Sequence, residues 1–496
     1  MQGSVPIRER EPGHLPGEGH RSGDRSHVRP ARRPRSGSRP SRREPPGPAR
    51  GRAALMARRQ SDRPRLRLYR WLAPTTLGTA VVALAAGFGQ FGAVAALGDV
   101  AKGFGRVVTG PTIADQAGLS GTELGIGLAV LRLASLGGLP LSGIADRYGR
   151  RALLLGCAAG GLCLTALAAL SPGYWWFVAL FALGRPLLSA SAAIAQVIAA
   201  EQTDTANRAR AIALVTAAYG VGSGLTAVIH ALASSSLGFR GLFALALVPL
   251  VALPVAGRRV AEPDRFVLAA TAEAREVPVL GALERAHRRR ILLVSAIAFF
   301  LAVMSGPANS FIFLYGQNVL HAAGAAIAVM VVGAGATGLL GLVVGQWLAD
   351  RLGRRPTGAL AMVSMALCAL LAYSGGRPAY FVGYLLAVLA GALFAPAAGA
   401  LVNEIFPTSV RASAAGWQVA ASVLGAVCGL LLFGTVADVG NRFSTGGLVA
   451  FSPAIPAAGL FFLLPETRGR EPEEVGDGAP WRGSSGTCAD ASSRPA

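Results

Sequence analysis

From about residue 75 onward, the chain alternates between predominantly apolar stretches of about twenty residues and short polar segments. A helix needs about twenty apolar residues to cross the ~30 Å hydrocarbon core of a bilayer. The pattern therefore predicts twelve membrane-spanning helices, although the segment Ser-Ser-Ser-Leu-Gly-Phe is a weak separator between the fifth and the sixth. We place them at 75–98, 124–143, 152–170, 174–199, 211–232, 240–256, 291–318, 323–348, 357–374, 380–402, 412–436 and 446–464.

The composition agrees with a membrane protein, because 52% of the 496 residues are hydrophobic and only 15% are charged. Soluble domains carry roughly a quarter charged residues. Gly and Ala are abundant inside the apolar stretches, where small side chains let membrane helices approach closely. Four of the five cysteines lie in these stretches without metal-ligand spacing, so we expect no disulfide framework, metal or cofactor.

The net charge of +21 is concentrated in the N-terminal tail, residues 1–70, which holds 19 Arg against 6 acidic residues. This segment is rich in Arg, Pro, Gly and Ser and cannot bury enough apolar surface to fold. We interpret it as an inert disordered tail, or as the result of a start assigned upstream of Met56; the alternative is a cytoplasmic tail attracted to anionic lipid. Nucleic acid is a disfavoured partner, because aromatic residues are not interleaved with the arginines.

Arginines also cluster in the loops after spans two, four, six, eight, ten and twelve, whereas the alternate loops hold few basic residues. Basic loops stay on the cytoplasmic side. We therefore expect a multi-pass plasma-membrane protein with both termini in the cytoplasm. The predicted organisation is a six-helix bundle over 71–256, a central cytoplasmic loop over 257–290, a second bundle over 291–466 and a disordered tail over 467–496.

Two charged loop motifs each occur twice in the chain, and the distance between the two copies is nearly the same for both. Ala145-Asp-Arg-Tyr-Gly-Arg-Arg151 returns 204 residues later as Ala349-Asp-Arg-Leu-Gly-Arg-Arg355, and Glu201…Arg208 returns 203 residues later as Glu404…Arg411. Such a repeat predicts two homologous halves of equal orientation, related by an axis along the membrane normal.

The repeated loops resemble the signature of the major facilitator superfamily after its helices two and eight. The run Asn403-Glu-Ile-Phe-Pro-Thr-Ser-Val-Arg411 is similar to the loop before helix eleven of that family, and Pro465-Glu-Thr-Arg-Gly-Arg-Glu471 resembles the end of helix twelve in its sugar-porter-like branch. The resemblance implies an all-α membrane fold of twelve helices in two pseudo-symmetric six-helix bundles. It also implies a transporter that works by alternating access, without cofactors, and not an enzyme.

In the resembled family these loops latch the cytoplasmic ends together when the carrier is open outward. Gly149 and Gly353 permit tight turns with positive φ. Asp146 and Asp350 can face a neighbouring helix N-terminus, whose dipole favours negative charge. The alternative is that the arginines only set the topology. The candidate gate residues are Asp146, Arg147, Gly149, Arg150, Glu201, Arg208, Asp350, Arg351, Gly353, Arg354, Glu404 and Arg411, with Glu201–Arg208 and Glu404–Arg411 as expected pairs.

Two arginines, Arg132 and Arg185, fall in the middle of predicted spans, where a charge costs at least ~2.5 kcal/mol. Arg185 also resembles the helix-four Arg that the family uses in coupling or substrate binding. Our hypothesis is that both arginines attract an anionic or strongly polar solute; the alternative is a structural role satisfied by helix carbonyls. The neutral candidates on the cavity path are Gln90, Asn309, Gln317 and Gln418, each of which would serve equally as an interhelical hydrogen-bonding group.

The sequence thus predicts a monomeric secondary transporter in the lipid bilayer. Its solute is a small polar organic molecule, and the two arginines favour an anionic one. Protons are a candidate coupling ion, although no Asp or Glu lies in the middle of a span and His230 fits a packed residue better than a proton relay. An efflux carrier for drugs or metabolites and a non-transporting sensor remain alternatives. Span five lacks the Gly-Pro pair of the family's antiporters, which favours uptake over export.

Overall fold

The computed structural model describes residues 72–108, 110, 112–204, 207–262 and 287–468, all of which belong to one compact unit, Leu66–Ala496. Our predictions for the N-terminal tail, for most of the 257–290 connection and for nearly all of the C-terminal tail fall outside these residues.

The regular structure of the described part is helical. Its longer helices are α2 (Pro74–Ala95), α3 (Leu97–Phe104), α5 (Gly121–Ala134), α6 (Gly138–Tyr148), α7 (Arg150–Leu167), α8 (Tyr174–Glu201), α9 (Arg208–Ala244), α10 (Leu247–Gly257), α12 (Arg288–Ser310), α14 (Gly324–Leu352), α15 (Arg354–Ala372), α16 (Arg377–Ile405), α17 (Thr408–Gly440) and α18 (Phe443–Phe451).

Short helical segments complete the spans. The 3₁₀ segment η2 (Ser135–Gly137) joins α5 to α6, and η3 (Ala168–Leu170) extends α7. After α12 come α13 (Ile312–Leu314) and the π-helical turn η4 (Tyr315–Val319), while α19 (Ala454–Ala457) and η5 (Ala458–Leu463) continue α18. The short helix α4 (Ile113–Ala117) lies between α3 and α5.

Eleven helical segments of the described chain are long and apolar enough to cross a membrane, and the shorter apolar helix α10 supplies a twelfth element. The weak point of the sequence-based division was the region 211–256. There, the helix α9 continues to Ala244 but is broken at Gly238, whose backbone is non-helical with φ +56°. The break separates the fifth span from the sixth, so each predicted apolar stretch corresponds to a helical segment.

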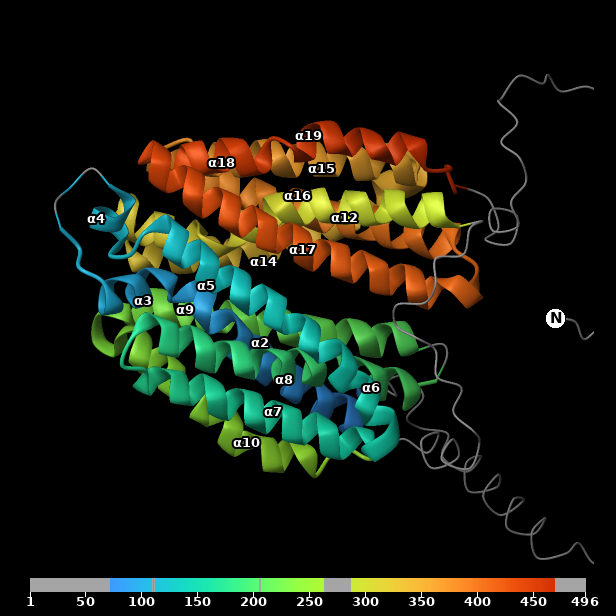
Figure 1. The fold of residues 1–496 in the computed structure, drawn as a ribbon. Helices are drawn as coiled ribbons and strands as arrows, with labels where there is room; N and C mark the ends of the chain where they lie inside the picture. The colour runs from blue at the N-terminus through green and yellow to red at the C-terminus, as the bar shows by residue number, and fades with distance from the viewer. Residues whose placement is uncertain (1–71, 109, 111, 205–206, 263–286, 469–496) are drawn as a thin grey trace, which may run out of the picture. The chain divides into compact units, whose positions relative to one another are not determined.

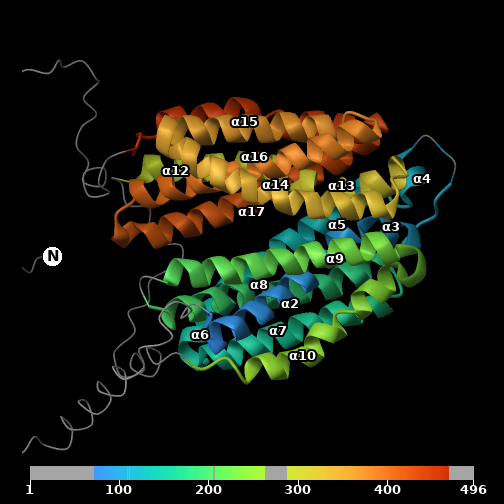
Figure 2. The ribbon, with the colours of Figure 1, turned by 180° about the vertical axis from the view of Figure 1, so that it is seen from behind.

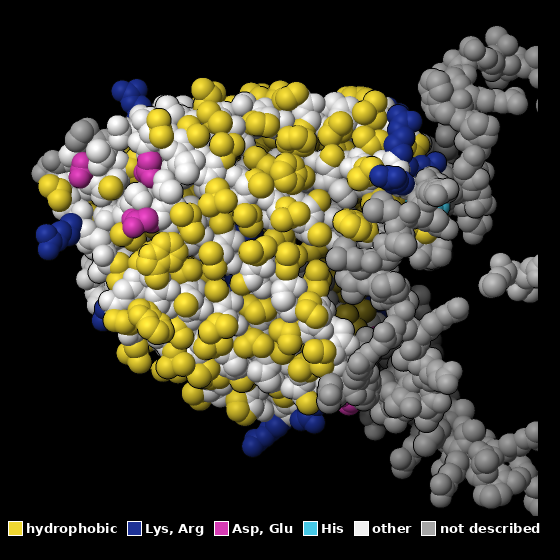
Figure 3. All heavy atoms as spheres, viewed as in Figure 1, with side chains coloured by type: hydrophobic (Ala, Val, Ile, Leu, Met, Phe, Trp, Pro, Cys, Tyr) yellow, Lys and Arg dark blue, Asp and Glu magenta, His cyan; other side chains and the backbone are white. Residues whose placement is uncertain are grey.

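The helices form two six-helix bundles, α2–α10 and α12–η5 (Figures 1 and 2). In the first bundle α2 packs against α8 and α9. In the second, α12 packs against α17 and α16 packs against α14 and α15. Hydrophobic side chains spread over both bundles on the face that Figure 3 shows. Trp176, Val251 and Val329 are among the most exposed large apolar residues of the described chain. An outer surface of this kind is expected where lipid, not water, is the solvent.

The two ends of the molecule differ in charge. We call the end that carries Asp99, Asp115, Glu123 and Asp438 the acidic face, and the end that carries Arg150, Arg208, Arg354 and Arg411 the Arg-rich face. Acidic side chains are visible at the end that bears α4 in Figure 3.

The bundles meet through α5 with α17 and through α9 with α14, near the acidic face. Contact is tightest at glycines. A Cβ on Gly434 would overlap the carbonyl of Gly121, and a Cβ on Gly324 would overlap that of Ala231. Toward the Arg-rich face, α17 and the α5–α6 segment run apart (Figure 1), and cavities lie between them. The described conformation is therefore closed at the acidic face and hollow toward the Arg-rich face.

Candidate substrate site and gates

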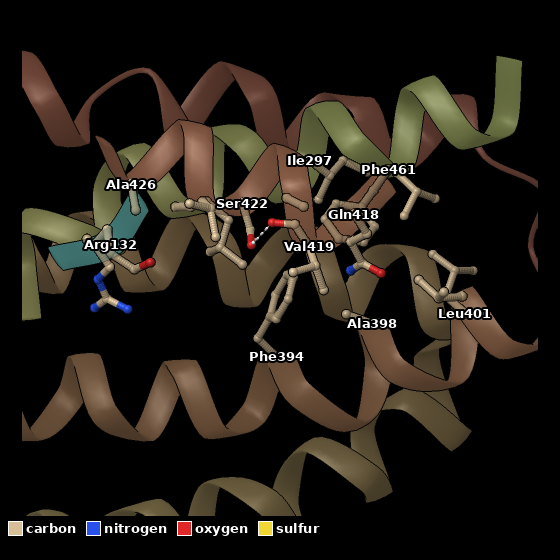
Figure 4. Close-up of a pocket in the computed structure, with 18 of the residues that line it drawn as sticks. Arg132, Ile297, Phe394, Ala398, Leu401, Gln418, Val419, Ser422, Ala426 and Phe461 are labelled. Carbon is tan, nitrogen blue, oxygen red and sulfur yellow. Dashed lines mark hydrogen bonds between the residues drawn. The ribbon is translucent and has the colours of Figure 1, made fainter. Parts of the chain in front are cut away.

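A pocket of about 510 Å³ lies between the two bundles. Arg132 enters it from α5 of the first bundle, while its other polar lining comes from α12 and α17 of the second bundle: Ser305, Asn309, Gln418 and Ser422. Figure 4 shows the Arg132 guanidinium at one end, the Gln418 amide toward the other and the Phe394 ring between them. Leu401 and Leu464, close to the Arg-rich face, also line it, so the pocket extends toward that face.

Arg132 has no hydrogen-bond partner for its guanidinium among the described residues, and no described carboxylate lines the pocket. Arg185, on α8, lies close enough for the like charges of the two arginines to repel each other. Its Nη1 donates to the carbonyl oxygen of Gln90 at 3.0 Å, while its Nε is buried without a partner in the described part. Two arginines that no described carboxylate neutralises are costly at membrane depth.

The side chain of Gln90 supports this arrangement from α2. Its Oε1 accepts a hydrogen bond from the Tyr219 hydroxyl at 3.1 Å, and Gln90 itself is buried. Of the six residues that the sequence suggested for the cavity, Arg132, Asn309 and Gln418 line the pocket. Arg185 and Gln90 contact each other within the first bundle and are not part of the lining. Gln317 lies elsewhere.

Gln317 belongs to a contact between the bundles at the acidic face. Its Nε2 lies 3.3 Å from Nδ1 of His230, and Nε2 of His230 lies 2.8 Å from the Asp99 carboxylate. The neighbouring Asn318 donates to the carbonyl of Gly98 at 3.1 Å. The sequence suggested His230 as a packed residue, and it is almost fully buried; the structure adds that it joins Asp99 of its own bundle to Gln317 of the other.

Asp438 makes a second contact between the bundles at the same face. Its carboxylate, at the end of α17, accepts from the backbone N–H groups of Gly121 and Thr122, both at 2.7 Å, and from the Thr122 hydroxyl. The first N–H groups of a helix have no partner within the helix. Asp438 satisfies two of them at the N-terminus of α5, where the helix dipole also favours its charge.

At the Arg-rich face the repeated loops adopt matching turns. Gly149 has φ +99° and Gly353 has φ +108°, a region that L side chains rarely enter, so the predicted need for glycine at both turns is confirmed. Each turn leads directly into a helix, α7 or α15, whose first N–H groups need an acceptor.

Those acceptors are Glu262 and Glu466, neither of which was among the predicted gate residues. Glu262 accepts from the backbone N–H groups of Arg150 and Arg151 at 2.6 and 3.0 Å. Glu466 accepts from those of Arg354 and Arg355 at 2.9 and 3.2 Å. Each carboxylate follows the first of its arginines by 112 residues. The two carboxylates thus form a third pair of residues that recurs at the same offset in the two halves, and this repeat is visible in the sequence.

The predicted gate residues form other pairs than expected. Glu201 pairs with Arg150 instead of Arg208, and Glu404 pairs with Arg354 at 3.5 Å instead of Arg411. Arg208 donates to the carbonyl of Ala200, and Arg411 to that of Phe406. These ion pairs connect helices of one bundle, because the arginine that follows each glycine turn reaches across to the end of α8 or α16.

The remaining gate residues are more exposed. Asp350 pairs with Arg354 at 3.3 Å, and the Arg351 guanidinium lies over the Trp347 ring. The side chains of Asp146 and Arg147 lie outside the described part of the structure, so their predicted roles in the latch stay predictions.

We expect Glu466→Gln and Glu262→Gln to lower the thermal stability of the purified protein. Each substitution removes a charge that accepts two backbone hydrogen bonds at a helix N-terminus. A hydrogen bond to a charged group contributes about 1.5–3 kcal/mol to the free energy of unfolding, which sets the upper limit for each lost bond. A fluorescence melting curve in detergent would measure the effect. Asp350→Asn is the matched control, because its carboxylate is 61% exposed and its pair is worth about 0–1 kcal/mol. Equal melting temperatures for all three variants would contradict the assigned caps.

A helical membrane protein of two like bundles, closed at one end and with a pocket between the bundles, has the architecture of a secondary carrier. The sequence matches the family described as Major Facilitator Superfamily over residues 79–371, and the one described as Sugar (and other) transporter over residues 267–478. The chain belongs to the Major Facilitator Superfamily. It is therefore a secondary transporter of small organic solutes and not an enzyme.

Among characterised relatives, a probable 4-methylmuconolactone transporter of Cupriavidus pinatubonensis is 25% identical over 385 residues, 74% of this chain and 87% of the relative. The 3-(3-hydroxy-phenyl)propionate transporter of Escherichia coli is 29% identical over 69% of this chain and 83% of its own length. A gallate transporter of Pseudomonas putida is 25% identical, with coverages of 71% and 87%.

Solved structures share the fold. The xylose transporter XylE from E. coli, in an inward-open conformation, superimposes with a TM-score of 0.63 at 18% identity, covering 81% of this chain and 98% of XylE. A bacterial homologue of the human lysosomal transporter Spinster gives 0.62 at 15% identity, with coverages of 80% and 97%.

Proposed function

We propose that this protein carries small organic carboxylates and that Arg132 and Arg185 bind the carboxylate group. The observation that carries the proposal is a pair of neighbouring arginines, Arg132 in the lining of the pocket and Arg185 behind it, whose charge no described carboxylate neutralises. An Arg guanidinium matches a carboxylate in geometry as well as in charge. An anionic solute would remove the repulsion between the two arginines while it is bound.

The names of the relatives support a carboxylate. Those of the E. coli and P. putida proteins specify 3-(3-hydroxy-phenyl)propionate and gallate, which are both aromatic carboxylates. The neutral polar groups in the pocket, Asn309, Gln418 and Ser422, are suited to the hydroxyl groups of such a solute. We therefore propose hydroxylated organic acids as the first solutes to test.

We further propose that the Arg-rich face is cytoplasmic, that the protein lies in the plasma membrane as a monomer, and that its halves span residues 71–256 and 291–466. Support for the orientation comes from the excess of arginine in the loops at that face. In this orientation the described conformation is open inward. The contacts of Asp438 and Gln317 hold the outer end closed, and the loops at the Arg-rich face act as the inner gate in the opposite state.

The test is uptake of labelled gallate into proteoliposomes containing the purified protein. We expect saturable uptake that other carboxylates inhibit, whereas their neutral amides do not. An inside-alkaline pH gradient that drives accumulation would establish proton coupling, and an unchanged rate would establish facilitated diffusion. Equal inhibition by carboxylates and amides would contradict the proposed role of the arginines.

Two alternative functions give different results in the same assay. An efflux carrier would extrude solute from preloaded vesicles against its gradient. A sensor on a carrier fold would bind the solute without moving it. The missing Gly-Pro pair in span five favours uptake over export.

A further inference from the structure

A second cavity of about 250 Å³ lies wholly inside the second bundle, between α12, α15 and α16. We call it the side chamber. Ser305 and Asn309, on consecutive turns of α12, line both the side chamber and the main pocket. The chamber therefore adjoins the main pocket at these two residues.

The walls of the side chamber are apolar and built from small residues. Ala308, Ala369, Ala372, Ala387 and Gly391 leave the space that larger side chains would fill, and Met304 and Met365 close it at the sides. Protein interiors are otherwise close-packed, with few voids larger than a water molecule. The chamber therefore exists because small residues occupy these positions.

Its size suits an aromatic ring. An apolar cavity of roughly 150 Å³ in a protein core binds benzene, so 250 Å³ accepts a six-membered ring with substituents. Two tyrosines face the chamber. The Tyr373 hydroxyl donates to the Ala308 carbonyl at 3.0 Å, which fixes its ring in the wall, and Tyr384 lines the chamber from α16.

The mouth of the chamber is polar. Asn309 donates through its Nδ2 to the Ser305 carbonyl at 2.8 Å, which orients the amide and leaves its Oδ1 as an acceptor. A ring hydroxyl can donate to this oxygen as the ring passes the mouth. Polar groups at the entrance and apolar walls beyond it match a phenolic ring better than an aliphatic chain.

We propose that the side chamber receives the aromatic ring of the transported solute while its carboxylate stays with Arg132 and Arg185. The inference rests on the proposed carboxylate transport and adds the specificity: an aromatic acid is selected over small aliphatic acids by a subsite within one bundle. Because the chamber lies inside the second bundle, the ring travels with that bundle and the carboxylate contacts the first. One solute would then connect the two bundles that must move relative to each other.

The test fills the chamber without touching the arginines. A Cβ on Gly391 would lie 3.4 Å from the Met365 methyl carbon, so the side chain of Gly391→Leu enters the chamber. We expect this variant to bind gallate about 10-fold more weakly or worse, because a hydrophobic pocket discriminates by that much for one methylene alone. Its affinity for lactate, a small aliphatic carboxylate, should stay within about twofold. Equilibrium binding to the purified full-length protein measures both.

Val382→Phe is the matched control, because it adds bulk to the same helix on a side chain that is 50% exposed on the outside. A second variant, Met365→Ala, enlarges the chamber and should improve the binding of naphthoate relative to gallate. This gain keeps the test informative if Gly391→Leu folds poorly.

The outcomes distinguish failure of the proposed carboxylate transport from failure of the side chamber as a ring-binding subsite. A wild-type protein that binds neither gallate nor lactate overturns the proposed function together with this inference. A wild-type protein that binds gallate, with Gly391→Leu losing both acids equally or neither, overturns the side chamber alone. Selective loss of gallate in Gly391→Leu, with an unchanged control, supports it.

Discussion

We expect Arg185→Gln to lose most carboxylate uptake while the protein still folds and inserts. The substitution removes one of the two charged donors that we propose for the carboxylate, and a hydrogen bond to a charged group contributes about 1.5–3 kcal/mol. This corresponds to a loss of about 10- to 100-fold in affinity. Arg132→Gln should have an effect of the same size, because its guanidinium has no other partner in the described part of the chain. Concentration-dependent uptake of gallate in proteoliposomes measures both.

Two further variants identify charge as the cause. Arg185→Lys keeps a positive charge near the carbonyl of Gln90 and should retain part of the uptake, although Lys cannot form the two-pronged contact of Arg. Arg377→Gln is the matched control outside the pocket, since Arg377 contacts only the carbonyls of Leu320 and His321 among the described residues. If Arg132→Gln and Arg185→Gln both transported anionic solutes as well as the wild type does, the arginines would have a structural role instead.

Much of the fold follows from local sequence. The length of the apolar stretches determined the twelve helical segments, and the repeated loops indicated two halves of equal orientation. The glycines at 149 and 353 were predictable because a tight turn between two helices requires positive φ. Even the uncertain division of 211–256 had a local cause, the non-helical backbone at Gly238.

The candidate substrate site could be predicted in part. Arg132 and Arg185 stood out because charge at membrane depth is costly and therefore demands a reason. The neutral residues carry no such cost, so sequence did not separate Asn309 and Gln418, which line the pocket, from Gln317, which does not. That distinction depends on the irregular end of the seventh span, where the π-helical turn η4 places Gln317 against His230.

The candidate gates depend on contacts between distant segments, and proximity in the sequence predicted the wrong ion pairs there. Glu201 lies near Arg208 in the chain, but the Gly149 turn brings Arg150 to it. Asp438 and the N-terminus of α5 are more than 300 residues apart. Such pairs form only after the helices have packed, so propensity and spacing carry little information about them.

The contact of Asp438 leads to the second large expected effect: Asp438→Asn shifts the protein away from the conformation closed at the acidic face. An Asn side chain has one carbonyl oxygen and no charge, so it cannot replace a carboxylate that accepts three hydrogen bonds from Gly121 and Thr122. Loss of one charged hydrogen bond, about 1.5–3 kcal/mol, changes the ratio of two conformations by about tenfold or more. Distances between spin labels on the α4–α5 turn and the α17–α18 turn, measured in detergent and in liposomes, would report the shift.

Asp115→Asn provides the control, because Asp115 also lies at the acidic face but, among the described residues, its carboxylate accepts only from Thr112 in its own short segment. It should leave the label distances unchanged. If the distribution were unchanged in Asp438→Asn as well, Asp438 would have no role in the gate.

The prediction also separates gating from binding. Arg185→Gln acts on affinity for the solute, whereas Asp438→Asn leaves the pocket intact and changes how often it is accessible from each side. A carrier must pass through both conformations in every cycle, so destabilising one of them lowers the maximal rate of uptake even when the bound solute keeps all its contacts.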